Sequence, residues 1–159
     1  AGEEAVKIPS GMRSPLTAES LEVKERENGN FRSDTEVYMD GMEVFNFAIR
    51  VVPKGVKAIV KEVGAGIDDT DYIVFHQSNR FMTDFFTKKL KIPESKVPYC
   101  IGRFGNTSSA SVPLTIVSEL QDRLAGKKNV VMCGFGAGLS WGTAWVSFNG
   151  CNISPLVEY

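Results

Sequence analysis

The first long run of regularly spaced apolar residues predicts a helix that begins just after Asp40. Asp40 can cap a helix, and Glu43 follows it at the spacing of a capping box. The positions that then recur at helical spacing predict a broad buried face, and they are Val44, Phe45, Phe47, Ala48, Val51, Val52, Val56, Ile59, Val60 and Val63. Pro53 interrupts this run, so we expect it to break or kink the helix or to begin a second one. Gly64 and Gly66 should end the helical region.

A short buried strand and a second helix come next. Residues 72–75 read Tyr-Ile-Val-Phe, and a continuous apolar run of this length is typical of a strand buried on both faces. A helix should begin near Asn79, because apolar residues follow it at helical spacing, namely Phe81, Met82, Phe85, Phe86 and Leu90. An aromatic stripe of this kind is far more often part of a core than of a cofactor site.

A third helix is predicted after residue 106. Residues 97–101 look strand-like, although Pro98 lies among them. Thr107 or Ser108 should then cap a helix whose apolar positions are Val112, Leu114, Val117, Leu120 and Leu124. Pro113 is compatible with this helix only if it lies near the first turn.

Two strands end the pattern. Residues 129–133 and 143–148 are apolar enough for strands, and a tight glycine-rich connection joins them, so we expect antiparallel neighbours. The full order is helix, strand, helix, helix, strand, strand. This order predicts a layered α/β fold.

The N-terminal 38 residues are less regular. Residues 6–8 could form a short strand, while residues 17–34 are polar and charged, with a turn signal at residues 28–30. We therefore divide the chain into an irregular lead-in and exposed loop over 1–38, a folded region over 39–148, and a tail over 149–159.

Composition removes several classes of function. With 159 residues the chain suits one domain, and a net charge of −1 gives no electrostatic reason to expect nucleic-acid or membrane binding. No apolar run is long enough to cross a bilayer, and the N-terminus lacks the pattern of a signal peptide. It also lacks an initiator Met, which suggests a fragment or a processed product. The three cysteines are not spaced as a disulfide framework or a zinc site, so we expect a reducing, cytoplasmic setting.

The candidate chemistry lies in three segments that each follow or join predicted strands. His76 is the only histidine and ends the strand at 72–75; Asn106 follows Gly105; residues 134–142 form a glycine-rich turn. Donors from such segments can converge on a carbonyl oxygen and stabilise its developing negative charge. Each segment also has a plainer interpretation, since a lone histidine is often structural and a glycine-flanked asparagine usually serves a turn. The glycine run matches neither a Walker loop nor a dinucleotide fingerprint.

Taken together, four blocks resemble the C-terminal half of the thiolase-fold condensing enzymes, and most closely the 3-oxoacyl-[acyl-carrier-protein] synthase III family. The blocks are residues 39–45 (Met-Asp-Gly-Met-Glu-Val-Phe), 76–79 (His-Gln-Ser-Asn), 105–113 (Gly-Asn-Thr-Ser-Ser-Ala-Ser-Val-Pro) and 135–142. The resemblance implies a thiolase-like half with a layered α/β fold and a mixed sheet.

The resemblance implies a reaction as well. The family joins an acyl group from acyl-coenzyme A to malonyl-acyl-carrier protein by decarboxylative Claisen condensation, through an acyl-cysteine. His76 and Asn106 match the family's histidine and asparagine, which stabilise the enolate. Acyl-coenzyme A is then a substrate, no metal or other cofactor is implied, and the intact enzyme should be a homodimer.

The family's nucleophilic cysteine has no counterpart here. It lies in the N-terminal half, and none of Cys100, Cys133 and Cys151 occurs in a matching context. We therefore expect about half of an enzyme, inactive by itself, whose partner is the N-terminal half of the same protein. The isolated chain should expose the surface that packs on that half, which predicts self-association or poor solubility.

Further assignments follow from the resemblance only. Gly41, Phe45 and Asn79 match positions that line the coenzyme A tunnel, although helix capping or core packing explains them equally well. Ala137 stands where the family usually has a glycine whose N–H completes an oxyanion hole. Either of two basic groups could meet an acidic carrier protein, unless both are simply solvated faces. One surrounds the second helix and comprises Arg80, Lys88, Lys89 and Lys91, and the other lies on the first helix and comprises Lys54, Lys57 and Lys61.

Two rival functions stay open. One is another condensing enzyme of this fold, in polyketide or quinolone synthesis. The other is a non-catalytic module that binds an acyl group or a carrier protein.

Overall fold

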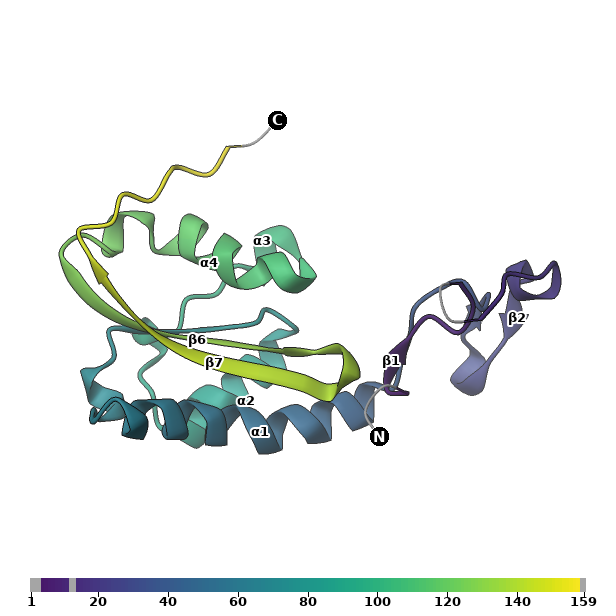
Figure 1. Cartoon of the computed structure of the whole chain (residues 1–159), viewed down its shortest axis with the longest axis horizontal. Coiled ribbons are helices and arrows are strands. Elements are labelled where there is room, and N and C mark those ends of the chain that lie inside the picture. The colour runs from purple at the N-terminus through teal and green to yellow at the C-terminus, as the bar shows by residue number, and fades with distance from the viewer. Residues whose placement is uncertain (1–3, 12–13, 158–159) are drawn as a thin grey trace. The chain divides into compact units, whose positions relative to one another are not determined.

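Figure 1 shows the chain as a computed structural model, which describes residues 4–11 and 14–157. The chain divides into two compact units. The smaller consists of Ala1–Phe47 and Gly136–Ser140, and the larger of Ala48–Phe135 and Trp141–Tyr159. Each unit is described by itself below, and the predicted borders at 38/39 and 148/149 stay predictions.

The larger unit is built on a three-stranded sheet with the order β5-β6-β7. β5 (Tyr72–Phe75) runs parallel to β6 (Lys127–Gly136), with Phe75 opposite Cys133. β7 (Ser140–Asn149) returns beside β6 as a long hairpin (Figure 1). Across this hairpin the Ser147 hydroxyl donates to Asn129 Oδ1 at 2.9 Å, and the Gly150 N–H donates to the Gly126 carbonyl at 3.2 Å. Both contacts fit one antiparallel register, so the sheet is mixed, as predicted.

Helices cover both faces of this sheet (Figure 1). α1 (Gly41–Glu62), from Ala48 onward, and α2 (Arg80–Leu90) lie on one face. α3 (Ile101–Phe104) and α4 (Ser111–Glu119) lie on the other. The layered α/β arrangement is confirmed, and so is the predicted order of helices and strands, except that the short helix α3 was not predicted.

The alternation of side chains along β5 and β6 divides the core into two layers. Val74 and Val130 point to the α4 face, where they form a buried cluster with three further residues, Ile116, Leu120 and Leu124. On the α2 face the ring of Phe86 lies 5.3 Å from Phe75 and 5.8 Å from Phe135, centroid to centroid. The strand at 72–75 is therefore buried on both faces, as its continuous apolar run predicts.

α1 is one continuous helix, so the predictions that Pro53 breaks it or begins a second helix are wrong. Pro53 has no N–H to donate to the carbonyl of Ile49. It nevertheless lies inside the helix and is buried, next to Val52 and near Val56, which are fully buried. Burial of this apolar face outweighs the lost hydrogen bond. The predicted N-terminal cap is confirmed, because the Asp40 carboxylate accepts the Glu43 N–H at 2.8 Å.

Two other predicted details are wrong. Residues 97–100 form no strand, because Pro98 lacks a donor and the Cys100 N–H donates to Gln77 Oε1 instead of to a neighbouring strand. α4 ends at Glu119 and is preceded by a 3₁₀ turn at Ser108–Ala110, and neither Thr107 nor Ser108 caps it. Ser108 is held at φ 52°, a left-handed conformation unlike that of a helix cap.

The smaller unit contains two short antiparallel pairs. β1 (Val6–Lys7) pairs with β4 (Tyr38–Met39). β2 (Lys24–Glu25) pairs with β3 (Phe31–Arg32) across a turn at Glu27–Gly29. The predicted strand at 6–8 and the turn at 28–30 are thus found, each with slightly different bounds. The predicted exposed loop carries more paired structure than its sequence indicates.

Across the described ranges 4–11 and 14–157, no helix is long and apolar enough to cross a bilayer.

Gly55 marks a close approach of α1 to β7, and it gives a test of this packing. A Cβ at Gly55 would lie 2.7 Å from Thr143 Oγ1, closer than real side chains approach. Glycine-to-alanine changes inside helices normally stabilise. We expect Gly55→Ala instead to lower the free energy of unfolding by about 1–3 kcal/mol through overpacking. Urea unfolding followed by Trp141 and Trp145 fluorescence would measure it.

Gly102→Ala is the matched control, because nothing lies within 4 Å of the Cβ it adds. Adding Thr143→Ala to Gly55→Ala should restore part of the loss. Equal stability of the two glycine variants would contradict this packing.

Candidate active site

His76 follows β5 directly and continues its ladder. The His76 N–H donates to the Cys133 carbonyl at 2.8 Å, in line with the β5–β6 pairing. Gln77, next to His76, is fully buried, and both ends of its side-chain amide hydrogen-bond to the backbone. Its Nε2 donates to the Phe75 carbonyl at 2.9 Å, and its Oε1 accepts the Cys100 N–H at 3.1 Å. These bonds hold His76 at the carboxyl end of the strand, where α/β folds place ligand sites.

The His76 imidazole is half-buried between a hydroxyl and an aromatic ring. Its Nδ1 lies 2.6 Å from Ser111 Oγ, and the ring meets Phe135 edge-on at a centroid distance of 5.2 Å. Burial lowers the pKa of His76 below its ordinary value, while a hydrogen bond with the backbone of Ser108 acts in the opposite direction. The ring is therefore neutral at pH 7 and can donate from one nitrogen and accept at the other.

Asn106 lies in the loop between α3 and α4 and keeps a donor group available. Its Oδ1 accepts the Ser108 N–H at 3.0 Å, a local turn that orients the amide, and its side chain is exposed. Among the described residues no hydrogen-bond partner is recorded for its Nδ2. The plain interpretation, that Asn106 serves a turn, is thus correct for its oxygen and leaves the nitrogen free to donate to a ligand.

Ser108 joins the two candidate residues. Its N–H donates to Asn106 Oδ1, and its carbonyl accepts from an N–H of the His76 ring, the direction that raises the pKa of His76. Ser108 itself is held at a positive φ of 52°, which is uncommon for a residue other than glycine and concentrates at functional sites. The structure therefore brings His76 and Asn106 to one place through a single strained residue.

Ala137 begins the 3₁₀ turn Ala137–Leu139 at the tip of the β6–β7 hairpin. This segment belongs to the smaller unit and is described by itself. The positive φ values in the turn fall on Gly138 and Leu139, not on Ala137. The Ala137 backbone therefore tolerates a Cβ.

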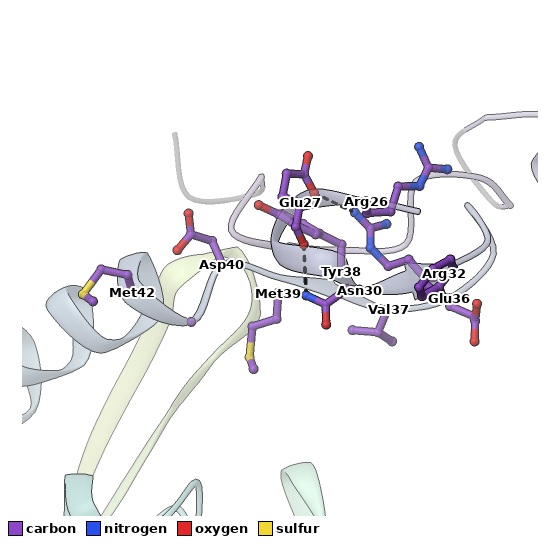
Figure 2. A pocket seen from close by; sticks show the side chains of 12 residues that line it. Arg26, Glu27, Asn30, Arg32, Glu36, Val37, Tyr38, Met39, Asp40 and Met42 are labelled. Carbon is purple, nitrogen blue, oxygen red and sulfur yellow. Dashed lines mark hydrogen bonds and ion pairs between the residues drawn. The ribbon is translucent and has the colours of Figure 1, made fainter. Parts of the chain in front are cut away.

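Gly41 and Phe45 lie on the first two turns of α1. Gly41 follows the capping Asp40, and Phe45 is half-buried. Gly41 also lines a cavity of about 600 Å³ within the smaller unit, shown in Figure 2. Arg26 and Arg32 line the same cavity. Arg26 pairs with Asp34 at 2.5 Å, and the Arg32 guanidinium stacks 4.6 Å from the Tyr38 ring centre.

The other sequence-predicted positions have local roles as well. Asn79 caps α2, since its Oδ1 accepts the Met82 N–H at 2.9 Å. Arg80 bonds Asp84 at 2.9 Å and stacks 4.6 Å from the Tyr99 ring centre. Lys88 and Lys91 are exposed at the C-terminal end of α2, where positive charge suits the helix dipole. None of these contacts excludes a ligand, and each explains the residue without one.

The cysteines differ sharply in environment. Burial raises the pKa of Cys133 to about 11, and its Sγ lies 3.5 Å from Thr143 Oγ1. Cys100 is buried too, with its Sγ 3.1 Å from Thr115 Oγ1, whereas Cys151 is exposed. A buried neutral thiol is a poor nucleophile. In the part of the chain that is described, no three metal-ligating side chains cluster.

Sequence reasoning missed Ser111 and the structural role of Gln77. Both occur inside the quoted blocks, yet neither spacing nor composition indicates that residues 34 or 35 positions apart meet. Their contacts become visible only when β5 and α4 pack together.

Comparison with known proteins identifies the family to which the chain belongs. Residues 60–148, just over half of the chain, match the family model described as 3-Oxoacyl-[acyl-carrier-protein (ACP)] synthase III C terminal. The chain belongs to this family. It is 38% identical over 140 residues to beta-ketoacyl-[acyl-carrier-protein] synthase III of Clostridium tetani (strain Massachusetts / E88), covering 85% of this chain and 41% of that protein.

Solved structures agree. The crystal structure of a 3-oxoacyl-(acyl-carrier protein) synthase from Burkholderia xenovorans LB400 matches with a TM-score of 0.87 and 39% identity, over 99% of this chain and 44% of the other. The priming beta-ketosynthase of the R1128 polyketide pathway matches with a TM-score of 0.65 and 33% identity, over 72% and 34% of the two chains. The fold is the thiolase-like C-terminal half, and the chain spans well under half the length of these relatives.

The different environments of the three cysteines predict which thiol reacts in the folded chain. Because Cys100 and Cys133 are buried and the pKa of Cys133 is raised, a maleimide at pH 7 should label Cys151 alone in the folded chain. In denaturant all three cysteines should react. Mass spectrometry of the labelled peptides would count them, and Cys151→Ser is the control that should abolish labelling of the folded chain. Rapid labelling of Cys133 without denaturant would contradict its assigned burial.

Proposed function

We propose that this chain supplies the C-terminal half of a 3-oxoacyl-[acyl-carrier-protein] synthase III. The complete enzyme would condense an acyl-coenzyme A primer with malonyl-acyl-carrier protein and so begin fatty-acid synthesis. The observation that supports this most is the joint attachment of His76 and Asn106 to the backbone of Ser108. Two donors held together in this way suit one carbonyl oxygen.

The reaction uses these donors at the step where charge develops. Loss of carbon dioxide from the malonyl thioester leaves its bonding electron pair on the α-carbon, and the charge spreads onto the thioester oxygen as an enolate. An N–H of neutral His76 and the Nδ2 group of Asn106 donate hydrogen bonds to that oxygen. The α-carbon then attacks the acyl-cysteine carbonyl, and the cysteine thiolate leaves. Donors fixed before the charge appears stabilise it without reorganising.

The remaining assignments belong to this proposal. The Ala137 N–H would bind the oxyanion at the acyl-cysteine, and Gly41, Phe45 and Asn79 would line the coenzyme A tunnel. Lys88 and Lys91 would meet the acidic carrier protein, together with Arg80 if it exchanges Asp84 for a carrier carboxylate. The enzyme would act in the cytoplasm.

The N-terminal half would supply the nucleophilic cysteine and cover apolar surface. The smaller unit exposes several large apolar side chains, namely Leu16, Leu21, Val23, Phe31 and Val37. Exposed apolar groups in this number are typical of an interaction surface. The intact enzyme would be a homodimer, like the family.

A priming role in polyketide synthesis is the alternative that a specific observation favours, since the R1128 priming beta-ketosynthase shares 33% identity. The two synthase III relatives described above match over more of this chain, 85% and 99%, and at higher identity, 38% and 39%. Primer preference, tested with short and branched acyl-coenzyme A, would separate the two.

The two donors can be tested directly. In the full reading frame that encodes this chain, His76→Ala and Asn106→Ala should each lower ketoacyl-carrier-protein formation by about 10²–10³, the usual effect of losing one oxyanion donor. The assay supplies acetyl-coenzyme A and malonyl-carrier protein and measures product by mass spectrometry.

Asn152→Ala is the matched control, because this exposed asparagine lies in the tail and takes no part in the site. Unchanged turnover in both active-site variants would refute the proposed roles. Silence of the wild type with every primer would favour a non-catalytic module.

A second test concerns the chain by itself. We expect residues 1–159 alone to form no ketoacyl product, because two cysteines are buried and none has the setting of an activated thiol. The same assay at raised protein concentration would check it, with the full reading frame as the positive control. Product from the purified chain would show that its chemistry does not need a second half.

A further inference from the structure

Ser111 connects the candidate histidine to the buried interior. The residue is 1% exposed and begins α4, and its hydroxyl oxygen lies 2.6 Å from His76 Nδ1. The same oxygen accepts the Gln77 N–H at 3.3 Å. The Ser111 hydroxyl is therefore placed between the strand end that carries His76 and the helix that follows Asn106.

The neighbouring hydroxyl is committed elsewhere. Thr115 Oγ1 donates to the Ser111 carbonyl at 2.7 Å, one turn back along α4. A serine hydroxyl has one hydrogen to donate and two lone pairs to accept with. Gln77 occupies one lone pair. The other described partner of the Ser111 oxygen is His76 Nδ1, at 2.6 Å, and the tautomer of His76 decides which of the two atoms donates.

We propose that Ser111 is a positioning residue that donates its hydroxyl hydrogen to His76 Nδ1 and thereby fixes the neutral imidazole with its proton on Nε2. The inference rests on the proposed function, in which that Nε2–H exchanges the Ser108 carbonyl for the enolate oxygen when the substrate binds. Beyond the proposed function, the inference identifies Nε2 as the donating atom of His76 and Ser111 as the residue that keeps the proton there.

The opposite assignment leaves a group unpaired. If His76 Nδ1 carried the proton and donated to Ser111, the Ser111 hydrogen would have to point into a site that is 1% exposed, with no acceptor recorded for it in the described part of the chain. An unsatisfied buried donor is more costly than an average hydrogen bond is favourable. The wrong tautomer would also present a lone pair, not a hydrogen, to a negatively charged oxygen.

The same contact opposes protonation of the ring. An imidazolium needs a hydrogen on Nδ1, which would displace the Ser111 hydrogen. A hydrogen bond to the neutral form lowers a histidine pKa. This effect has the same direction as burial, which lowers the pKa of His76, and opposes the hydrogen bond with the Ser108 backbone, which raises that pKa. Ser111 thus keeps His76 neutral as well as correctly oriented.

Nitrogen NMR tests the proposal without any activity measurement. His76 is the only histidine of the chain, so ¹⁵N-histidine labelling gives one set of ring signals. The chemical shifts and N–H couplings distinguish a protonated ring nitrogen from an unprotonated one. We expect Nε2 to carry the proton at pH 7 and Nδ1 to be the hydrogen-bonded acceptor. In the full reading frame, the loss of signal in His76→Gln identifies the same resonances if the chain alone does not fold.

Two variants separate positioning from general packing. Ser111→Ala should mix the tautomers, raise the pKa of His76 and lower ketoacyl formation about tenfold, the equivalent of one buried hydrogen bond. Thr115→Val removes the adjacent buried hydroxyl, which does not touch His76, and should leave both the tautomer and the pKa unchanged.

The outcomes are distinct. A wild-type ring protonated on Nδ1, or an unchanged tautomer and pKa in Ser111→Ala, would overturn the inference and leave the proposed function standing. If the Nε2–H form is found but His76→Ala condenses normally, the proposed function fails, and the positioning role fails with it. An Nε2–H ring that loses its preference only in Ser111→Ala, with reduced condensation, supports both.

Discussion

The parallel pairing of β5 with β6 is the constraint on which the site depends. At one end of the pair the Asp71 carboxylate accepts the Asn129 N–H at 2.8 Å and bonds Lys128 at 3.1 Å. At the other end the His76 N–H donates to the Cys133 carbonyl. A shift by one residue would move each side chain to the opposite face. The register therefore determines which residues enter each core layer. It also places the histidine at the carboxyl edge of the sheet.

The polar groups beyond that edge form a connected network of hydrogen bonds. Gln77 Nε2 donates to the Phe75 carbonyl, and Gln77 Oε1 accepts the Cys100 N–H. Because the Cys100 N–H is used in this way, it cannot pair with a neighbouring strand, and residues 97–100 do not join the sheet. Ser111 accepts from Gln77 and contacts His76, while Thr115 contacts both Ser111 and Cys100. Buried networks of this kind fix one arrangement because a partly satisfied arrangement is unfavourable. The strained Ser108 is held beside this network.

Much of the fold follows from the sequence because burial in this chain is periodic. The 72–75 run, the cap at Asn79 and the glycine-rich hairpin are local signals with local causes, and all three predictions hold. Pro53 shows where local rules fail, since packing of the surrounding apolar face decides the outcome. The cap of α4 fails for a different reason. Ser108 has the right side chain for a cap, but its backbone serves Asn106 and His76 instead. The site residues were found through four blocks in order, whereas Ser111 required the three-dimensional packing of α4 on β5.

The distribution of chemistry between halves of the fold has a physical basis in this chain. Its donors lie at a strand end and in a loop, where they remain accessible while the backbone behind them is buried. Its thiols at Cys100 and Cys133 are buried within the layers, and burial raises the pKa of Cys133. An acyl carrier needs a thiolate that is both accessible and stabilised, and neither layer provides such a position. The layering that buries these two thiols is the same layering that leaves His76 partly exposed at the end of β5 and Asn106 exposed in its loop.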